Sequence, residues 1–260
     1  SHHAARCFLL NNRGAIAPGF LADFVVIDNF DDFNILEVYK KGRLMFDGKT
    51  VTPFEEPEID PHLVKRSHET FHVAHLEATD FIESRPRAVL GMVPGEIVTT
   101  DAGYAEKISV EDDILKIAVI ERHKNTHHIG IGYIKGYGLK SGAVATSISH
   151  DSHNIIVVGA NEEDMAAAVN RVVELGGGIV VMEDGKVLGE VQLQIAGIMS
   201  EAPLIEVNEA LENAKEQAFK LGVSSGVDPF MTLSFMALTV IPTLRLTTRG
   251  VFDVINQRYV

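Results

Sequence analysis

The chain has 260 residues, of which 46% are hydrophobic, and its formal net charge at pH 7 is −13. A chain of this length can bury a full core in one large domain or two modest ones. The acidic balance argues against nucleic acid or an anionic membrane surface as the main partner. The single cysteine, Cys7, excludes an internal disulfide framework and is typical of a reducing cytoplasm.

The first part of the chain alternates turns with short apolar strands. Residues 4–10 favour a short helix. Strands are predicted at residues 24–27, 38–40 and 43–46. Asp47-Gly48 turns the chain after the last of them, and the pattern resembles one edge of a β-sandwich. Residues 50–66 are rich in Pro, Asp and Glu, so we predict a first domain at 1–55, a linker at 56–66 and a second domain at 67–260.

The N-terminal end shows no capping lead-in and no signal-peptide pattern. We expect Ser1-His2-His3 to be either a tag remnant or the point at which a longer protein was cut. No apolar run approaches the roughly 20 residues of a membrane-spanning helix, so no membrane partner is expected.

The second domain combines apolar runs rich in Val and Ile with two amphipathic segments. This predicts an α+β domain in which helices cover a sheet. Strands are predicted at residues 71–76, 115–121, 143–148, 155–158, 179–182 and 187–193. One helix is capped by Asn161 and ends at Gly176, and another starts at Pro203 and ends at Gly222. Five glycines within residues 130–142 predict a backbone that another group approaches closely.

A run of six polar residues, Ser-His-Asp-Ser-His-Asn at 149–154, separates two of the predicted strands, and we call it the polar loop. Its imidazoles, His150 and His153, and its carboxylate, Asp151, are the groups that proton transfer, metal ligation or nucleobase recognition would use. The alternative is a polar turn whose side chains satisfy local backbone groups. The residues alone do not decide between the two.

Residues 68–72 match the pattern H-E-x-x-H, in which two histidines one helical turn apart bind zinc and the glutamate acts as general base. The neighbouring residues argue against such a site, because Thr70 and Phe71 favour a strand. On a strand, His68 and His72 would lie about 13 Å apart, at ~3.3 Å rise per residue, and could not bind one ion. No phosphate-binding glycine loop, serine nucleophile elbow or cysteine nucleophile stands out.

Two sets of motifs carry a family resemblance. The run G-A-I-A-P-G at 14–19, followed by A-D-F-V-V at 22–26, resembles the β-sandwich segment that follows the (β/α)8 barrel in the amidohydrolase superfamily. The runs at 149–159 (S-H-D-S-H-N-I-I-V-V-G), 170–178 (N-R-V-V-E-L-G-G-G) and 228–238 (D-P-F-M-T-L-S-F-M-A-L) are similar to the C-terminal domain of the bacterial adenine deaminases. The resemblance covers nearly the whole chain.

The resemblance implies a cytoplasmic hydrolase of purine salvage that converts adenine to hypoxanthine and ammonia through a metal-activated hydroxide. The metal would be manganese or iron, held on barrel strands that open with an H-x-H motif. This chain has neither that motif nor the barrel, so it carries no assigned metal ligand and is expected to be inactive alone. The implied partners are adenine, the missing N-terminal barrel and further copies of the same protein in a homo-oligomer.

Two hypotheses follow for the second domain. In the first, it packs by the barrel mouth, and His150, Asp151 and His153 help to shape the purine site. In the second, it serves folding or subunit assembly and touches no substrate.

Overall fold

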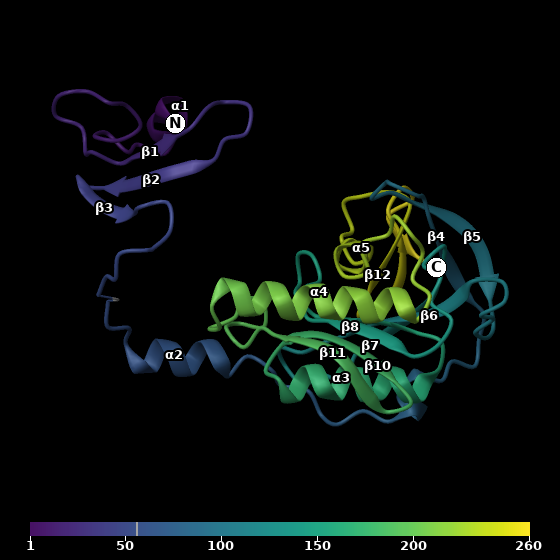
Figure 1. The fold of residues 1–260 in the computed structure, drawn as a ribbon. Coiled ribbons are helices and arrows are strands. Elements are labelled where there is room, and N and C mark those ends of the chain that lie inside the picture. Colours follow the sequence, from purple (N-terminus) through teal and green to yellow (C-terminus); the bar gives the residue numbers. More distant parts are fainter. Residues whose placement is uncertain (56) are drawn as a thin grey trace. The chain divides into compact units, whose positions relative to one another are not determined.

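The computed structural model describes residues 1–55 and 57–260 (Figure 1). The chain separates into two compact units, Ser1–Ile59 and Asp60–Val260. The fold is α+β, and the described strands form sheets of three, eight and three strands and no (β/α)8 barrel. None of the described helices combines the length and the apolar character needed to cross a membrane.

The first unit contains a short helix and a three-stranded antiparallel sheet. Helix α1 spans His2–Cys7, and the strands pair in the order β1 (Phe24–Ile27), β2 (Ile35–Lys40) and β3 (Arg43–Phe46). The three predicted strands are confirmed, although β2 begins at Ile35 rather than at residue 38. The Asp47 carboxylate accepts hydrogen bonds from the backbone N–H groups of Lys49 and Thr50, which explains the turn after β3.

The first unit buries very little apolar surface. Of its described hydrophobic residues, only Ala5 is buried, whereas Leu9, Ile16 and Phe30 are 79%, 91% and 89% exposed. A domain normally buries the apolar face of its sheet against another layer, and extensive exposed apolar surface marks an interaction site. This exposure is expected for one part of a larger β-sandwich.

The second unit is built on one eight-stranded sheet. Its strands run β11-β10-β8-β9-β6-β7-β4-β5 from edge to edge, and neighbours are antiparallel except for β4 and β7. The bounds are β4 (Arg87–Met92), β5 (Thr99–Ala105), β6 (Ile114–Ile120), β7 (Ile129–Lys135), β8 (Ala143–Thr146), β9 (Ile155–Gly159), β10 (Gly178–Glu183) and β11 (Lys186–Gln192). A small antiparallel sheet follows, made of β12 (Leu244–Thr247), β13 (Gly250–Asp253) and β14 (Arg258–Tyr259).

Helices pack on both faces of the large sheet, as Figure 1 shows for α3 (Glu162–Glu174) and α4 (Leu204–Lys220). Alternate residues of β6 divide between two cores. Ile117 and Val119 join the core with α4 and α5 (Met231–Met236), whereas Ala118 and Ile120 join the core with α3 and the 3₁₀ turn η1 (Ala78–Phe81). Strands buried on both faces have nearly continuous apolar sequences, and the sequence shows such runs for β8, β9 and β10, and for β6 apart from Lys116.

Helix α3 has the ends that the sequence predicts. The Asn161 side chain accepts a hydrogen bond from the Asp164 backbone N–H at 2.7 Å, which caps the first turn. Gly176, with φ of +71°, follows the last turn in the left-handed conformation that glycine tolerates. The buried stripe contains Met165, Ala168, Val169 and Val172.

The start of the second unit differs from the prediction. Residues 71–76 form no strand, although the His72 backbone N–H donates to the Arg122 carbonyl at 2.8 Å. Phe71 and Leu76 instead pack into the core with α3, so tertiary packing overrides their strand propensity. Part of the segment assigned to a linker is helical, because helix α2 spans Pro61–His68 and is capped by Asp60.

Candidate functional site

The polar loop connects β8 to β9 at one end of the large sheet. Ile120, the last residue of β6, pairs with Ile155, the first residue of β9. The segment that follows β6 therefore runs beside the polar loop. Within the loop, Asp151 and Ser152 are exposed, whereas Ser149 is fully buried.

The two imidazoles of the loop lie close together. The ring centroids of His150 and His153 are 5.9 Å apart, with one ring edge facing the other ring. Helix α5 holds the first of them, because the His150 backbone N–H donates to the Ser234 carbonyl at 2.9 Å and its ring lies 5.0 Å from the Phe235 ring. The bend is closed by a hydrogen bond of 2.6 Å from the His153 N–H to the Ser149 carbonyl. The chain thus presents two imidazoles on one rigid turn.

Arg122, the second residue after β6, organises the surroundings of the loop. Its side chain is almost fully buried, and its guanidinium donates to the carbonyl of His153, to that of Thr70 at 2.9 Å and to that of Ala196 at 2.9 Å. The Phe71 ring stacks on the same guanidinium, with its centroid 4.3 Å away. Burial lowers the pKa of Arg122 to about 10, so it stays charged at neutral pH.

Arg122 therefore ties together three chain segments that are distant in sequence. The role of Arg122 is not apparent from the sequence. Its only local signal is a charged side chain directly after a buried strand, and the three carbonyls that it binds are set by tertiary structure.

Two polar atoms of the loop are buried without a hydrogen-bond partner among the described residues, Ser149 Oγ and His153 Nδ1. Burial lowers the pKa of His153, and the nearby His150 and Arg122 lower it further. The neutral imidazole is favoured, and its Nδ1 can accept or donate one hydrogen bond according to the tautomer. Groups of this kind bind an ordered water molecule, an ion or a ligand, or they strain the fold.

The lowered pKa of His153 predicts a pH dependence of stability. The unfolded chain binds a proton at this residue near its ordinary pKa of about 6.5, and the folded chain binds it only at lower pH. The free energy of unfolding should therefore fall as the pH drops through the interval between the two values. We expect His153→Gln to lose this component, so that its urea midpoint falls less than that of the unchanged chain between about pH 7.5 and pH 5. Equal falls in the urea midpoint for the two proteins would show that His153 is not the source of this pH dependence.

A pocket of about 300 Å3 lies beside the polar loop. Asp151, Ser152 and Asn154 line one side, and residues 237–240 and 246–248 line the other. The exposed Asp151 carboxylate accepts hydrogen bonds, which suits an amine or an N–H group. The pocket is large enough for a small ligand or a side chain of a partner.

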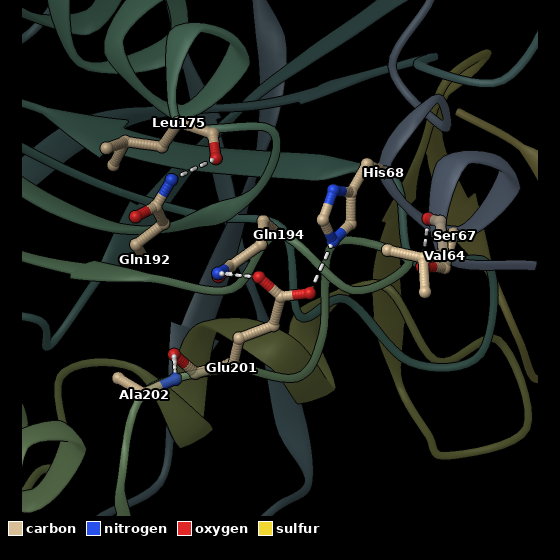
Figure 2. Close-up of polar contacts among 9 residues, drawn as sticks. Val64, Ser67, His68, Leu175, Gln192, Gln194, Glu201 and Ala202 are labelled. Carbon is tan, nitrogen blue, oxygen red and sulfur yellow. Dashed lines mark hydrogen bonds and ion pairs between the residues drawn. The ribbon is translucent and has the colours of Figure 1, made fainter. Parts of the chain in front are cut away.

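The H-E-x-x-H residues do not form a metal site. Helix α2 ends at His68, so His72 lies outside the helix. The His68 ring nitrogen Nε2 lies 2.9 Å from Glu201 Oε1, and the Gln194 side-chain amide donates to Glu201 Oε2 at 3.2 Å; Figure 2 shows both contacts. Within residues 1–55 and 57–260, no group of three or more His, Cys, Asp and Glu side chains is arranged to hold a metal ion.

The family model described as the adenine deaminase C-terminal domain matches residues 96–258, which is more than half of the chain. The chain belongs to the adenine deaminase C-terminal domain family. It is 41% identical to "Adenine deaminase 2" of Carboxydothermus hydrogenoformans over 97% of this chain and 45% of that protein. It is 39% identical to "Adenine deaminase" of Bacillus subtilis over 100% of this chain and 47% of that protein. The chain therefore spans about half the length of the curated relatives that it matches.

The family match gives the polar loop and its surroundings their context. Residues 96–258 include β5 to β13, the polar loop, Arg122 and helix α5. The contacts described above that position His150 and His153 therefore lie within the matched range. The exceptions are the contacts that Thr70 and Phe71 make with Arg122.

Proposed function

We propose that this chain is the C-terminal portion of an adenine deaminase, an enzyme that hydrolyses the exocyclic amine of adenine to give hypoxanthine and ammonia. The proposal is carried by the similarity over nearly the whole chain to relatives that bear this name. We further propose that the parent protein acts in purine salvage in the cytoplasm and assembles as a homo-oligomer.

The hydrolysis needs an activated water molecule, which a bound manganese or iron ion would supply in the parent enzyme by lowering the pKa of that water. The described residues of this chain do not fit such an ion, because no cluster of three ligating side chains is present among them. We therefore expect the ligands in the part of the relatives' length that this chain does not span. That part is also the expected partner of the first unit, whose exposed Ile16 and Phe30 need a covering layer.

The first test is activity. The purified chain should release no ammonia from adenine above the uncatalysed rate, with or without added manganese or iron, because its described residues offer no metal centre. The measurement is ammonia release in a coupled assay, with a full-length relative as the positive control. Turnover by this chain alone would refute the proposal that it is only part of the enzyme.

Within the parent enzyme, we propose that the polar loop helps to shape the purine site. Adenine presents ring nitrogens that accept hydrogen bonds and an exocyclic amine that donates them. Asp151 can accept from the amine, and a neutral His153 can donate to a ring nitrogen or pass a proton to the leaving ammonia. Strands β8 and β9, Arg122 and α5 hold these groups in place.

This role predicts a separation of activity from stability. In the full-length enzyme, Asp151→Asn or His153→Ala should lower kcat at least tenfold, roughly 1.4 kcal/mol of activation free energy, while Tm stays nearly unchanged. His62→Ala, at an exposed position of α2, serves as the control and should retain full turnover. Normal turnover in a destabilised Asp151 or His153 variant would show that the polar loop is not part of the active site.

A second candidate function is structural, in which the domain serves folding or assembly without touching substrate. One observation favours it: the His153 carbonyl is committed to Arg122 inside the fold, and Ser149 is fully buried. The same paired measurement of kcat and Tm decides between the two candidates, because the structural role predicts loss of stability with normal turnover in the folded fraction.

A further inference from the structure

A second and larger cavity, of about 550 Å3, lies between helix α5, the turn at residues 93–97 and the loop at residues 224–228. This volume is within the range of small-molecule sites, about 300–1,000 Å3. The cavity shares no lining residue with the pocket beside the polar loop. It is therefore a separate candidate for ligand binding.

The walls of this cavity are held by buried hydrogen bonds. The fully buried guanidinium of Arg245 donates to the Ile97 carbonyl at 2.6 Å and to the Ile241 carbonyl at 2.8 Å, which fixes the turn at 93–97 against the small sheet. Next to the lining residue Asp228, the Pro229 carbonyl accepts a hydrogen bond from the Tyr137 hydroxyl at 2.8 Å. Because both walls are fixed in this way, a ligand would not have to pay the entropy of ordering them.

The lining selects for an aromatic molecule without phosphate groups. The apolar lining residues include Met92, Ile97, Met231, Phe235 and Met236. Methionine adapts to flat ligands, and Phe235 offers an aromatic ring for stacking. No lysine or arginine is among the described residues of the lining, whereas Glu96 and Asp228 are. An anionic ligand would meet two carboxylates in the lining, and the Lys215 ammonium beside them is already paired with Asp228.

Asp228 provides a specific acceptor for an amine. Its Oδ1 accepts the backbone N–H groups of Phe230 and Met231 at 3.0 Å and 2.8 Å, which orients the carboxylate. Its Oδ2 forms a long ion pair with the Lys215 ammonium at 3.9 Å, a separation too large for a hydrogen bond. Oδ2 can therefore accept a hydrogen bond from a ligand.

We propose that this cavity binds a small planar heteroaromatic molecule that carries an amine and no phosphate, with its ring against Phe235 and its amine donating to Asp228. The amine and the absence of phosphate follow from the lining, whereas the heteroaromatic ring and the choice of adenine as probe rest on the proposed function. The Phe235 ring also lies against the His150 ring. A ligand in the cavity would therefore contact a side chain that touches the polar loop.

The test is a titration of the chain, labelled with 13C in the methionine methyl groups, with adenine and with adenosine 5′-monophosphate. Adenine should shift the Met92, Met231 and Met236 resonances saturably and leave Met199, which does not line the cavity, unchanged. The monophosphate should bind at least tenfold more weakly. Ser225→Trp places a bulky ring at an exposed lining position and should abolish the shifts, whereas Ser84→Trp, at an exposed position outside the lining, should not.

Three outcomes would overturn the proposal: no shift at the three methionines with millimolar adenine, equal shifts in Ser225→Trp, or binding of the monophosphate as tight as that of adenine. Asp228→Asn should weaken adenine binding about tenfold, and an unchanged affinity would remove the carboxylate from the site. The titration measures binding to this chain without turnover. A parent enzyme that fails to deaminate adenine would refute the proposed function and leave the cavity's preference for an amine without phosphate intact, while unchanged methionine signals would refute the cavity and leave the function standing.

Discussion

Replacing Arg122 by methionine is expected to lower the free energy of unfolding by at least about 3 kcal/mol. The substitution keeps an apolar stem beside Phe71 but removes the donors that satisfy the carbonyls of His153, Thr70 and Ala196. A buried carbonyl without its partner costs ~1–3 kcal/mol, and the lower end of this range applies to each of the three carbonyls because their hydrogen bonds to Arg122 are only partly buried. Urea unfolding followed by circular dichroism measures the change.

Arg171→Met is the matched control. Arg171 on α3 pairs with Glu190 and Glu174 at the surface, where its side chain is about one-third exposed. Exposed ion pairs contribute roughly 0–1 kcal/mol, so this variant should stay close to the unchanged chain. Similar losses for both variants would show that Arg122 is not the link between the three segments.

A second readout separates the roles of Arg122. Arg122→Lys keeps the charge but not the planar fork of the guanidinium. If Arg122 positions the polar loop, this variant should be more stable than Arg122→Met but should still have altered His153 imidazole resonances. If Arg122→Lys had the stability and the His153 resonances of the unchanged chain, Arg122 would act through its charge alone.

The central strands could be predicted because they are buried on both faces. The runs at 115–121, 143–148 and 155–158 are almost continuously apolar, and the structure places β6, β8 and β9 there. The hairpin of β10 and β11 and the capped helix α3 also follow from local residues, Asp184-Gly185 and Asn161. In these elements local propensity and tertiary packing agree.

Other elements could not be predicted because their residues give mixed signals. Strand β7 has the sequence I-G-I-G-Y-I-K, in which glycine weakens the strand pattern, and the small sheet β12–β14 consists of strands of two to four residues. Residues 71–76 look like a strand, yet Phe71 and Leu76 are apolar because they fill a core under a loop. Leu204, the first residue of α4, is apolar but 83% exposed.

The candidate site was only partly accessible from sequence. The polar loop is recognisable because six polar residues in a row separate two apolar runs. Its neighbours Arg122, Ser234 and Phe235 come from segments about 30 to 85 residues away in the chain, and no local pattern connects them. Spatial convergence of this kind needs the strand order of the sheet, which periodicity does not specify.

The glycines of β7 were expected to mark a close approach, and Gly130 meets that expectation. A methyl group added at Gly130 would lie 1.8 Å from the Thr247 carbonyl oxygen and 2.7 Å from the Gly250 nitrogen. The hairpin of β12 and β13 therefore packs directly on the backbone of β7. That hairpin also carries Thr247, which lines the pocket beside Asp151.

Gly130→Ala is therefore expected to destabilise the second unit by about 3 kcal/mol or more, at the upper end of overpacking costs, because the clash is with backbone and no side-chain rotation relieves it. Gly103→Ala is the control: unlike Gly130, Gly103 has a left-handed backbone, with φ of +88°, but nothing lies within 4 Å of the added methyl. Its cost should be only the ~1–2 kcal/mol of a left-handed alanine. Hydrogen exchange should show that Val251 loses protection in Gly130→Ala and keeps it in Gly103→Ala. Equal urea midpoints and equal protection in the two variants would mean that β7 and the hairpin do not depend on this contact.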